Sequence, residues 1–364
     1  MKAKTDKPFN YKTNFVYTTQ KAKETTHIDV ELNVDNKFPI LEIFADVHLA
    51  KEDIEIILKA MQRDISNRMP VNAKECVIFV TGGYSLSALT TFKIGGKAKS
   101  LCLVSTEDAI SEAIEILKKC GTDYYIIGAG SNLLVSDKGF NGTIIYLGEY
   151  FSNIRLEGES TIIAQAGATL KDLTDFTLEK SLTGLEFAEG IPGSVGGSCV
   201  MNAGAYGGEM KDVIKEVRAM DSLGNIQVIS SEEMDFGYRT SKAMKENLII
   251  TEVTFILAKG EKDIIKATID ELRQKREEKQ PLDLPSAGSV FKRPEGHFAG
   301  KLIMDAGLAG YKVGGAMVSE KHCGFIVNHD NATCEDVLNL IEHIQNTVYK
   351  KFGVKLEREV RVLK

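Results

Sequence analysis

The sequence lacks the features that mark membrane-spanning, secreted or thiol-based metal proteins. Its 364 residues contain no apolar run near the ~20 residues that span a bilayer, and the N-terminus lacks the apolar core of a signal peptide. The six cysteines include no CxxC pair, so we expect neither a zinc site nor a redox dithiol. These absences favour a reduced, cytoplasmic setting.

A net positive charge and a cluster of histidines are also absent. The net charge of −6 argues against a broad nucleic-acid surface, although residues 1–23 form a basic arm that we expect to be solvated. The six histidines are scattered, which argues against a metal site and against a histidine-based triad. What remains is the composition of an ordinary globular chain, 43% hydrophobic, with room for two or three domains.

The first 80 residues carry no chemical motif. Residues 1–27 are polar, and we expect them to be poorly ordered. Apolar patterning predicts strands at 28–34, 40–47 and 76–80 and a helix at 51–66. Together these elements predict a small α/β module, which is marginal alone and is expected to dock on the remainder.

A strand–helix–strand unit follows, with strands at 101–104 and 124–127 and a helix at 109–119 that Ser105 and Asp108 are expected to cap. The second strand leads into Gly128, Ala129, Gly130, Ser131 and Asn132, and a glycine turn in that place commonly binds phosphate. Leu133 stands where the dinucleotide fingerprint has its last glycine, so a Rossmann arrangement is weakly supported. A polar turn bonded to its own backbone is the alternative.

The rest of the chain is organised around residues 190–208, GIPGSVGGSCVMNAGAYGG. Seven of these nineteen residues are glycine, and a Cβ-free path of backbone N–H groups favours a cradle for phosphate or pyrophosphate. The alternative is a series of tight turns at a sheet corner. We interpret Cys199 as a small apolar filler.

Apolar patterning predicts the remaining elements. Strands are expected at 143–147, 154–156, 161–166, 213–221, 226–229, 248–256 and 323–327, and helices after Thr169, at 263–279, and from Thr333 with Asp336 as its cap partner to Gly353. Strict alternation over 354–363 predicts a last strand with Glu359 and Arg361 on one face.

Six motifs occur in one order: TTFKIGG, IGAGSNLLVSD, GIPGSVGG with MNAGAYGGE, YRTS, SAGSVFKRP and LEREVRV. Each alone is a weak signal, but in this order they resemble the UDP-N-acetylenolpyruvoylglucosamine reductases, flavoenzymes of bacterial cell-wall synthesis. The resemblance runs from about Leu89 to the C-terminus. It is similar to the shorter class of that family, which lacks an inserted tyrosine-bearing loop, and the first 80 residues are extra.

The resemblance implies an α+β architecture of the vanillyl-alcohol-oxidase (PCMH) type, with an FAD-binding fold, a C-terminal α/β substrate-binding domain and an extra small N-terminal α/β module. The implied domains are residues 1–80 of unknown role, FAD-binding subdomains 81–150 and 151–260, a substrate-binding domain 261–353, and a strand 354–364 that returns to the flavin. In that family NADPH reduces non-covalently bound FAD. The flavin then passes hydride to C3 of the enolpyruvyl group, giving UDP-N-acetylmuramate. The partners are therefore the UDP-sugar and NADPH, without nucleic acid or a membrane span, and the N-terminal module is left for an unknown partner.

The resemblance also implies residue roles. Arg239 and Glu359 hold the substrate carboxylate on which negative charge builds, and Ser289 donates a proton to C2. Tyr238 and Lys292 contact substrate. The cofactor-binding set is Gly128, Ala129, Gly130, Ser131, Asn132, Gly190, Ile191, Pro192, Gly193, Ser194, Val195, Gly197, Ala203, Gly204 and Arg361.

The residues themselves leave structural, non-catalytic roles open as alternatives. Arg239 beside a tyrosine is more often a surface ion pair, Ser289 is more often a turn residue, and Glu359 is more often on a solvated strand face. Two other functions compete with the reductase: a flavin oxidoreductase of the same fold with another acceptor, and a scaffold with a vestigial reductase. The presence of Ser289 and Glu359 argues against the first, and the filled catalytic positions argue against the second.

Overall fold

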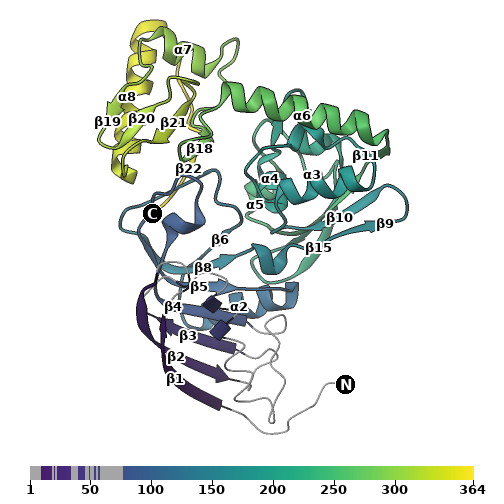
Figure 1. Cartoon of the computed structure of the whole chain (residues 1–364), viewed down its shortest axis with the longest axis vertical. Helices are drawn as coiled ribbons and strands as arrows, with labels where there is room; N and C mark the ends of the chain where they lie inside the picture. The colour runs from purple at the N-terminus through teal and green to yellow at the C-terminus, as the bar shows by residue number, and fades with distance from the viewer. Residues whose placement is uncertain are drawn as a thin grey trace. The chain divides into compact units, whose positions relative to one another are not determined.

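The computed structural model describes residues 10–18, 20, 23–33, 40–45, 49, 53–54, 56–57 and 77–364 (Figure 1). The chain divides into two compact units. The first consists of Met1–Ser85, Lys97–Ile127 and Asn141–Phe151, and the second of Leu86–Gly96, Gly128–Phe140 and Ser152–Lys364. Among the described residues, no helix is long and apolar enough to cross a bilayer.

The first unit is built on a seven-stranded sheet in the order β1-β2-β3-β4-β5-β8-β6. The strands are β1 Asn10–Thr18, β2 Thr25–Asn33, β3 Ile40–Ala45, β4 Val77–Ser85, β5 Lys97–Leu103, β6 Tyr124–Ile127 and β8 Phe140–Tyr146. Strand β4 pairs with β3 on one side and with β5 on the other. The first 80 residues therefore join the following segment through one continuous sheet.

One expectation for the N-terminal region needs correction, and another lies mostly outside the described residues. Residues 10–18 are not poorly ordered, because they form β1, whose nine residues pair with β2. An antiparallel ladder satisfies backbone groups whatever the side chains, so polar composition was a poor guide there. Strands β2, β3 and β4 confirm the predicted strands, whereas most of the helix predicted at 51–66 lies outside the described residues, of which 53–54 and 56–57 are helical.

Helix α2 (Glu107–Lys119) confirms the predicted helix but not its cap. The N-cap is Thr106 rather than Ser105, and the Thr106 hydroxyl accepts a hydrogen bond from the Ala109 amide at 3.1 Å. The predicted motif was one residue out of register, and Thr106 has the extended backbone that an N-cap adopts. Short helix η3 (Glu149–Phe151) ends this unit.

The second unit contains a five-stranded sheet in the order β15-β14-β16-β10-β9. Its strands are β9 Ile154–Glu157, β10 Thr161–Gln165, β14 Ile214–Met220, β15 Ile226–Ser230 and β16 Ile249–Ile256. The helices of this region are α3 Leu170–Glu179, α4 Val195–Met201, α5 Lys242–Glu246 and α6 Lys262–Lys279, with short helices η4 Glu186–Ala188 and η5 Met210–Asp212. Helix α4 packs against β10 and β16, and α6 packs against α3 and η4.

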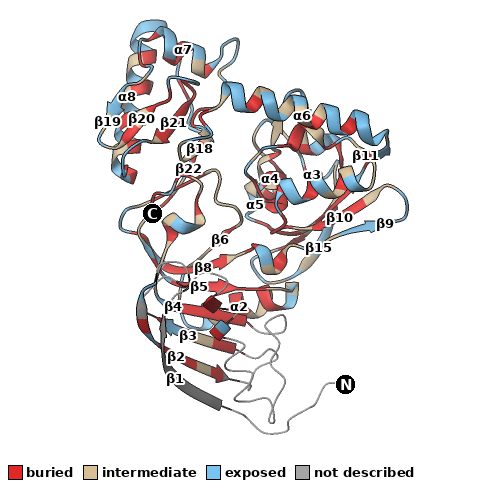
Figure 2. Ribbon diagram, viewed as in Figure 1, coloured by how far each residue is buried: buried red, intermediate tan, exposed pale blue. Residues whose placement is uncertain are grey.

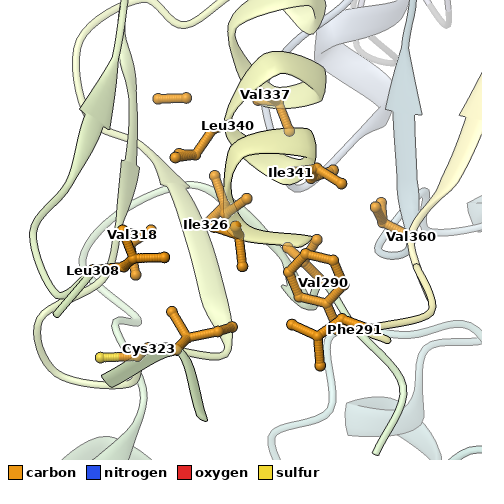
Figure 3. Close-up of a cluster of buried hydrophobic side chains, with 14 of the residues drawn as sticks. Val290, Phe291, Leu308, Val318, Cys323, Ile326, Val337, Leu340, Ile341 and Val360 are labelled. Carbon is orange, nitrogen blue, oxygen red and sulfur yellow. The ribbon is translucent and has the colours of Figure 1, made fainter. Parts of the chain in front are cut away.

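The C-terminal part of this unit carries a four-stranded sheet, β18-β21-β20-β19. Its elements are β18 Ser286–Ser289, β19 Lys312–Val313, β20 Ala316–Val318, β21 Phe325–Asn328, α7 Ala299–Asp305 and α8 Cys334–Phe352. The predicted capping box of Thr333 and Asp336 is confirmed, and Gly353 ends α8 at φ +70°. Figure 3 shows the apolar side of α8 packed on β21, with Val290 and Val360 in the same cluster.

Short segments of the second unit complete the fold. Strand β7 (Leu133–Val135) pairs in parallel with β22 (Arg361–Leu363), and helix η2 (Leu86–Leu89) precedes the TTFKIGG segment. Two small pairs, β11 Leu182–Thr183 with β17 Ala258–Lys259 and β12 Gly204–Ala205 with β13 Gly208–Glu209, close loops.

The prediction of a final strand over 354–363 is wrong for most of this range. Only Arg361–Leu363 is a strand, and Arg358 makes a single bridge to Phe291. The backbone bends at Val360 because one carbonyl, that of Val290, accepts hydrogen bonds from both the Glu359 and the Val360 amides, at 2.8 and 3.4 Å. The alternation that placed Glu359 and Arg361 on one strand face therefore does not hold.

Candidate active site

The first glycine-rich segment, residues 128–132, leaves β6 with its backbone amides uncommitted. Among the described residues, none of its five N–H groups donates to a backbone carbonyl. Gly130 is required here: its φ is +60°, and an added Cβ would stand 2.0 Å from the Leu89 carbonyl oxygen. The segment thus presents free donors on a tightly constrained path, as an anion cradle requires.

Asn132 ends this segment and ties it to the C-terminus. Its side-chain Nδ2 donates to the Glu359 carbonyl at 3.3 Å, and its own carbonyl accepts from the Arg361 amide at 3.1 Å. Its Oδ1 is buried and has no hydrogen-bond partner among the described residues. An unpaired buried acceptor is costly, so this atom fits a donor supplied by a bound ligand.

The second glycine-rich segment, residues 190–208, folds around helix α4. Its helix-start amides are used inside the protein: Val195 N donates to Ala168 O at 2.8 Å, and Gly196 N to Ala166 O at 2.9 Å. The Ser194 hydroxyl caps the helix by accepting from Gly197 N at 3.4 Å. The glycines here chiefly permit close packing, since a Cβ on Gly196 would lie 2.6 Å from the Ala166 Cβ.

Asn202 ends α4 in the left-handed conformation, at φ +43°, and is fully buried. Its Oδ1 accepts from the Lys211 amide at 3.0 Å, and its Nδ2 donates to Glu209 Oε2 at 3.0 Å and to the Gly237 carbonyl at 3.1 Å. Ser241 adds a second anchor, because its hydroxyl donates to the Val200 carbonyl at 2.7 Å. Both residues fix the turn at 237–240 onto α4.

Arg239 projects from that turn at φ +56°, a conformation that arginine seldom adopts. Its Nε donates to Glu359 Oε1 at 3.0 Å, and its Nη2 donates to the Gly204 carbonyl at 3.2 Å. The two side chains are 21% and 13% exposed, so the pair is largely shielded but still reachable. The Arg239 guanidinium also lies 5.2 Å from the centre of the Tyr238 ring.

Burial raises the pKa of Glu359 above its ordinary value, and the neighbouring Arg239 and Lys292 only partly offset this effect. Removing a carboxylate from water disfavours its charged form, whereas an adjacent cation favours it. The direction of the shift indicates that Glu359 takes up a proton more readily than an exposed glutamate does.

Ser289 lies at the end of β18, next to the residue whose carbonyl holds Glu359 in place. It follows Gly288, which has φ +74°, and a register shift in the pairing of β18 with β21 turns this corner. The Ser289 side chain is exposed, and within the described chain its hydroxyl has no hydrogen-bond partner. A hydroxyl in that setting is available to a ligand.

Tyr238 and Lys292 line a cavity of about 510 Å³ together with Arg293, His297 and Lys355. The Tyr238 hydroxyl accepts from the Arg293 amide at 3.1 Å, and Lys292 is ion-paired with Glu357. The cavity has the size of a small-molecule site, and its lining carries three cations together with the carboxylates of Glu295 and Glu357.

The structure thus brings Asn132, Gly204, Arg239 and Glu359 into one hydrogen-bonded group. Ser289 precedes Val290, whose carbonyl accepts from the Glu359 amide. Arg361 joins the group through its backbone, and its exposed side chain makes no hydrogen bond or ion pair with any residue that the structure describes. The Ala203 carbonyl is taken by the Met210 amide. Sequence reasoning missed Asn202 and Ser241, although a left-handed asparagine after a short glycine-rich helix is a recognisable C-terminal signal.

No group of three or more histidine, cysteine, aspartate or glutamate side chains in the described part of the chain is arranged to hold a metal ion. Free amides, a buried unpaired acceptor and an arginine–glutamate pair instead suit an organic cofactor and an anionic substrate. A family model described as an FAD binding domain matches residues 98–230, which makes the protein a flavoprotein of mixed α/β structure.

A second family model, the C-terminal domain of UDP-N-acetylenolpyruvoylglucosamine reductase, matches residues 280–363. A protein of that name from Clostridium botulinum (strain Eklund 17B) is 53% identical over 278 residues, or 76% of this chain and 91% of that protein. One from Alkaliphilus metalliredigens is 52% identical over 75% of this chain and 90% of its own length. The chain belongs to the UDP-N-acetylenolpyruvoylglucosamine reductase family, as the motifs predicted.

A solved structure supports the same conclusion. The crystal structure of UDP-N-acetylenolpyruvylglucosamine reductase from Thermus caldophilus is 36% identical, with a TM-score of 0.68. The match covers 79% of this chain and 99% of that one. Nearly the whole length of the relative therefore has a counterpart in this chain, which also has residues beyond the match.

Proposed function

We propose that this chain uses NADPH to reduce the enolpyruvyl group of UDP-N-acetylenolpyruvoylglucosamine, giving UDP-N-acetylmuramate for peptidoglycan synthesis. The observation that carries the proposal is the Arg239–Glu359 pair, 3.0 Å apart, together with the exposed Ser289, whose neighbour Val290 accepts a hydrogen bond from the Glu359 amide. The names of the relatives supply the substrate, and this group of side chains has the charges that its chemistry needs.

FAD fits the residues present. The free amides of 128–132 suit its pyrophosphate, and the unpaired Oδ1 of Asn132 suits one of its N–H or O–H donors. The second segment contributes the exposed loop residues Gly190 and Pro192, with Gly197 on the outer side of α4. When bound, FAD supplies the hydride that it has received from NADPH.

The chain's own residues then manage charge and proton. Addition of hydride to the enolpyruvyl C3 places negative charge on the neighbouring carboxylate, and in this proposal the Arg239 guanidinium, held by Glu359 and Gly204, neutralises that charge. Glu359, with its raised pKa, can donate a hydrogen bond to the same oxygen while protonated. Ser289 delivers the proton to C2, because the enolate is basic enough to take it from a hydroxyl held close.

We assign the cavity beside Tyr238 and Lys292 to the sugar nucleotide. Its volume, about 510 Å³, supports a small-molecule ligand, and its three cations outnumber its two carboxylates, which suits a diphosphate. We also retain the division into FAD-binding subdomains 81–150 and 151–260, a substrate domain 261–353 and a returning segment 354–364. The parallel pairing of β22 with β7, next to Asn132, supports the last of these. The five described cysteines are all free, which supports a cytoplasmic setting.

The decisive experiment separates the two half-reactions in Ser289→Ala. Flavin reduction by NADPH should stay within about threefold of the parent, whereas muramate formation should fall by roughly 10²–10⁴-fold, the range for loss of a general acid. Ser286→Ala, in the same strand, is the matched control and should leave both half-reactions unchanged. Parental rates of muramate formation by Ser289→Ala would refute the role of this hydroxyl, and a parent protein without bound flavin would refute the function.

A further inference from the structure

Glu357 is a charged residue of the cavity that the mechanism above does not use. The two segments that carry it and Lys292, residues 353–359 and 292–297, are mostly exposed or half-buried (Figure 2). The Glu357 carboxylate is ion-paired with the Lys292 ammonium, and the two side chains are 70% and 32% exposed. Both residues line the cavity, and Lys292 is the more shielded partner.

The backbone sets Lys292 opposite Glu357. An isolated antiparallel bridge joins Phe291 to Arg358, and beside it the Lys292 amide donates to the Glu357 carbonyl at 2.9 Å. Directly opposite residues of an antiparallel pair have neighbouring side chains. The pairing of these two charges therefore follows from the register of the two segments.

Lys292 also acts on a second carboxyl group, that of Glu359. Burial raises the pKa of Glu359, and the charges of Arg239 and, less strongly, Lys292 oppose that rise. Among the described residues these two cations face the carboxyl, Arg239 from the turn at 237–240 and Lys292 from the segment after β18. On its own segment, Glu357 lies two residues before Glu359 and Arg361 two residues after it. Lys292 thus influences two carboxyl groups and forms its ion pair with the exposed one.

An exposed ion pair contributes little to stability, so the importance of this one lies in where it holds a charge. The lysine ammonium has three N–H donors on a flexible stem. While Glu357 engages one donor, two remain for an anionic ligand in the cavity. Without Glu357, the Lys292 ammonium is free to turn to the Glu359 carboxyl, and a direct ion pair there favours the ionised form of Glu359.

We propose that Glu357 is a positioning residue, whose carboxylate holds the Lys292 ammonium at the cavity and keeps it from pairing with Glu359. This proposal rests on the proposed function in assigning the cavity to the sugar nucleotide, because the remaining donors of Lys292 are then available to its diphosphate. One exposed carboxylate thereby supports both the binding of the diphosphate and the protonation of Glu359.

Urea denaturation of the apo-protein at a series of pH values tests the hold on Lys292 without any ligand. The pH dependence that belongs to Glu359 is isolated by repeating each measurement with Glu359→Gln added. In Glu357→Gln the free energy of unfolding should stop falling at a lower pH than in the parent, because Lys292 then pairs with Glu359 and lowers its pKa. With Lys292→Met already in place, Glu357→Gln should not move that pH.

An equal shift with and without Lys292 would overturn the proposal, since Glu357 would then act on Glu359 directly, through repulsion between like charges. The absence of any shift in Glu357→Gln would overturn it as well. Because Glu357 is 70% exposed, we expect this variant to fold as the parent does, and far-UV circular dichroism checks it.

Calorimetric titration with UDP tests the binding step, and Glu295→Gln is the matched control. Glu295 lines the same cavity and makes no ion pair with any described residue, so its variant removes the same charge and leaves Lys292 held. We expect Glu357→Gln to bind UDP about fivefold or more weakly than Glu295→Gln does. Glu357→Asp, which keeps the carboxylate, should bind UDP within about threefold of the parent.

Equal UDP affinity in Glu357→Gln and Glu295→Gln would overturn the proposal, because Glu357 would then contribute only its negative charge to the cavity. A parent that binds neither UDP nor flavin would instead contradict the proposed function. In that case the pH measurements on the apo-protein would still decide whether Glu357 keeps Lys292 from Glu359.

Discussion

The two glycine-rich segments of this chain look alike in sequence and differ in what their glycines do. The amides of residues 128–132 donate to no backbone carbonyl among the described residues. In residues 190–208, by contrast, the first amides of α4 donate to the Ala166 and Ala168 carbonyls and to the Ser194 hydroxyl. The first segment therefore suits an anion, and the second chiefly allows a helix to pack closely against β10 and β16. Glycine content alone does not distinguish a cradle from a packing surface.

The comparison extends to the Arg239–Glu359 ion pair, because each segment contacts one member of it. Asn132 of the first segment binds the backbone on both sides of the Glu359 carboxyl, at Glu359 O and Arg361 N. The second segment holds Arg239 through Gly204 and, by way of Asn202, through Gly237. The Arg239–Glu359 ion pair is thus held from both segments, and in the proposed function this links the proposed cofactor segments to the proposed substrate-binding pair.

The largest effect on stability is expected from Gly130→Ala in the first segment. An added methyl group would stand 2.0 Å from the Leu89 carbonyl oxygen, and the residue would be forced to φ +60°. We expect the free energy of unfolding to fall by about 3 kcal/mol or more, combining steric overlap with backbone strain. Urea denaturation of the apo-protein measures it.

Gly158→Ala is the matched control, because Gly158 has φ +63° but nothing within 4 Å of an added Cβ. Gly158→Ala should lower the free energy of unfolding only by the backbone strain, about 1 kcal/mol. Equal losses in the two variants would show that the close approach to Leu89 does not constrain the first segment, and the contrast between the segments would lose its structural basis.

The next effect concerns Glu359 and appears as a pH dependence. Its folded-state pKa is raised, so above its ordinary value near 4.5 the folded protein retains a proton that the unfolded chain has released. The free energy of unfolding should therefore fall as pH rises through this window, by at most about 1.4 kcal/mol per pH unit, the limit for one proton. Glu359→Gln should remove that slope.

Urea denaturation of the apo-protein at a series of pH values checks this expectation. Arg239→Met should extend the window to higher pH, because Arg239 holds the pKa of Glu359 down. A slope that is the same in the parent and in Glu359→Gln, or a window that Arg239→Met does not move, would mean that the two segments are not linked through this pair.

A smaller effect is expected from Ser194→Ala at the start of α4. The Ser194 hydroxyl caps the helix, and loss of such a cap costs about 1 kcal/mol. The loss in free energy of unfolding should be the same with and without FAD if the first amides of α4 bind protein groups rather than the cofactor. Thr169→Ala, which removes the cap of α3, is the control for the size of the effect. A cost that changes markedly on adding FAD would assign the α4 amides to the ligand after all.

The sequence predicted local elements and family well, and it predicted spatial packing poorly. The capping box of Thr333 and Asp336 is written in adjacent residues, and the six motifs need only their order, so both were accessible. The bend at Val360 was not, because it depends on the carbonyl of Val290, seventy positions away. Strand β1 was missed for the same reason, since its pairing with β2 rather than its own composition orders it. The role of Asn202 likewise depends on Gly237, which sequence spacing does not bring near.

The smallest effect on stability, and the sharpest test of the second segment, is expected from Gly197→Ala. Gly197 is exposed on α4, and an added Cβ would meet only the Ser194 hydroxyl, at 3.2 Å. Alanine favours a helix over glycine by up to about 1 kcal/mol, so the free energy of unfolding should stay level or rise slightly. If the outer side of α4 faces FAD, the same methyl group should nevertheless weaken FAD binding by about tenfold, through overlap with the ligand alone. Fluorescence titration of the apo-protein measures that affinity, and Gly158→Ala should leave it unchanged. Parental affinity in Gly197→Ala would mean that the second segment is a packing surface throughout and that the first segment alone holds the cofactor on this side.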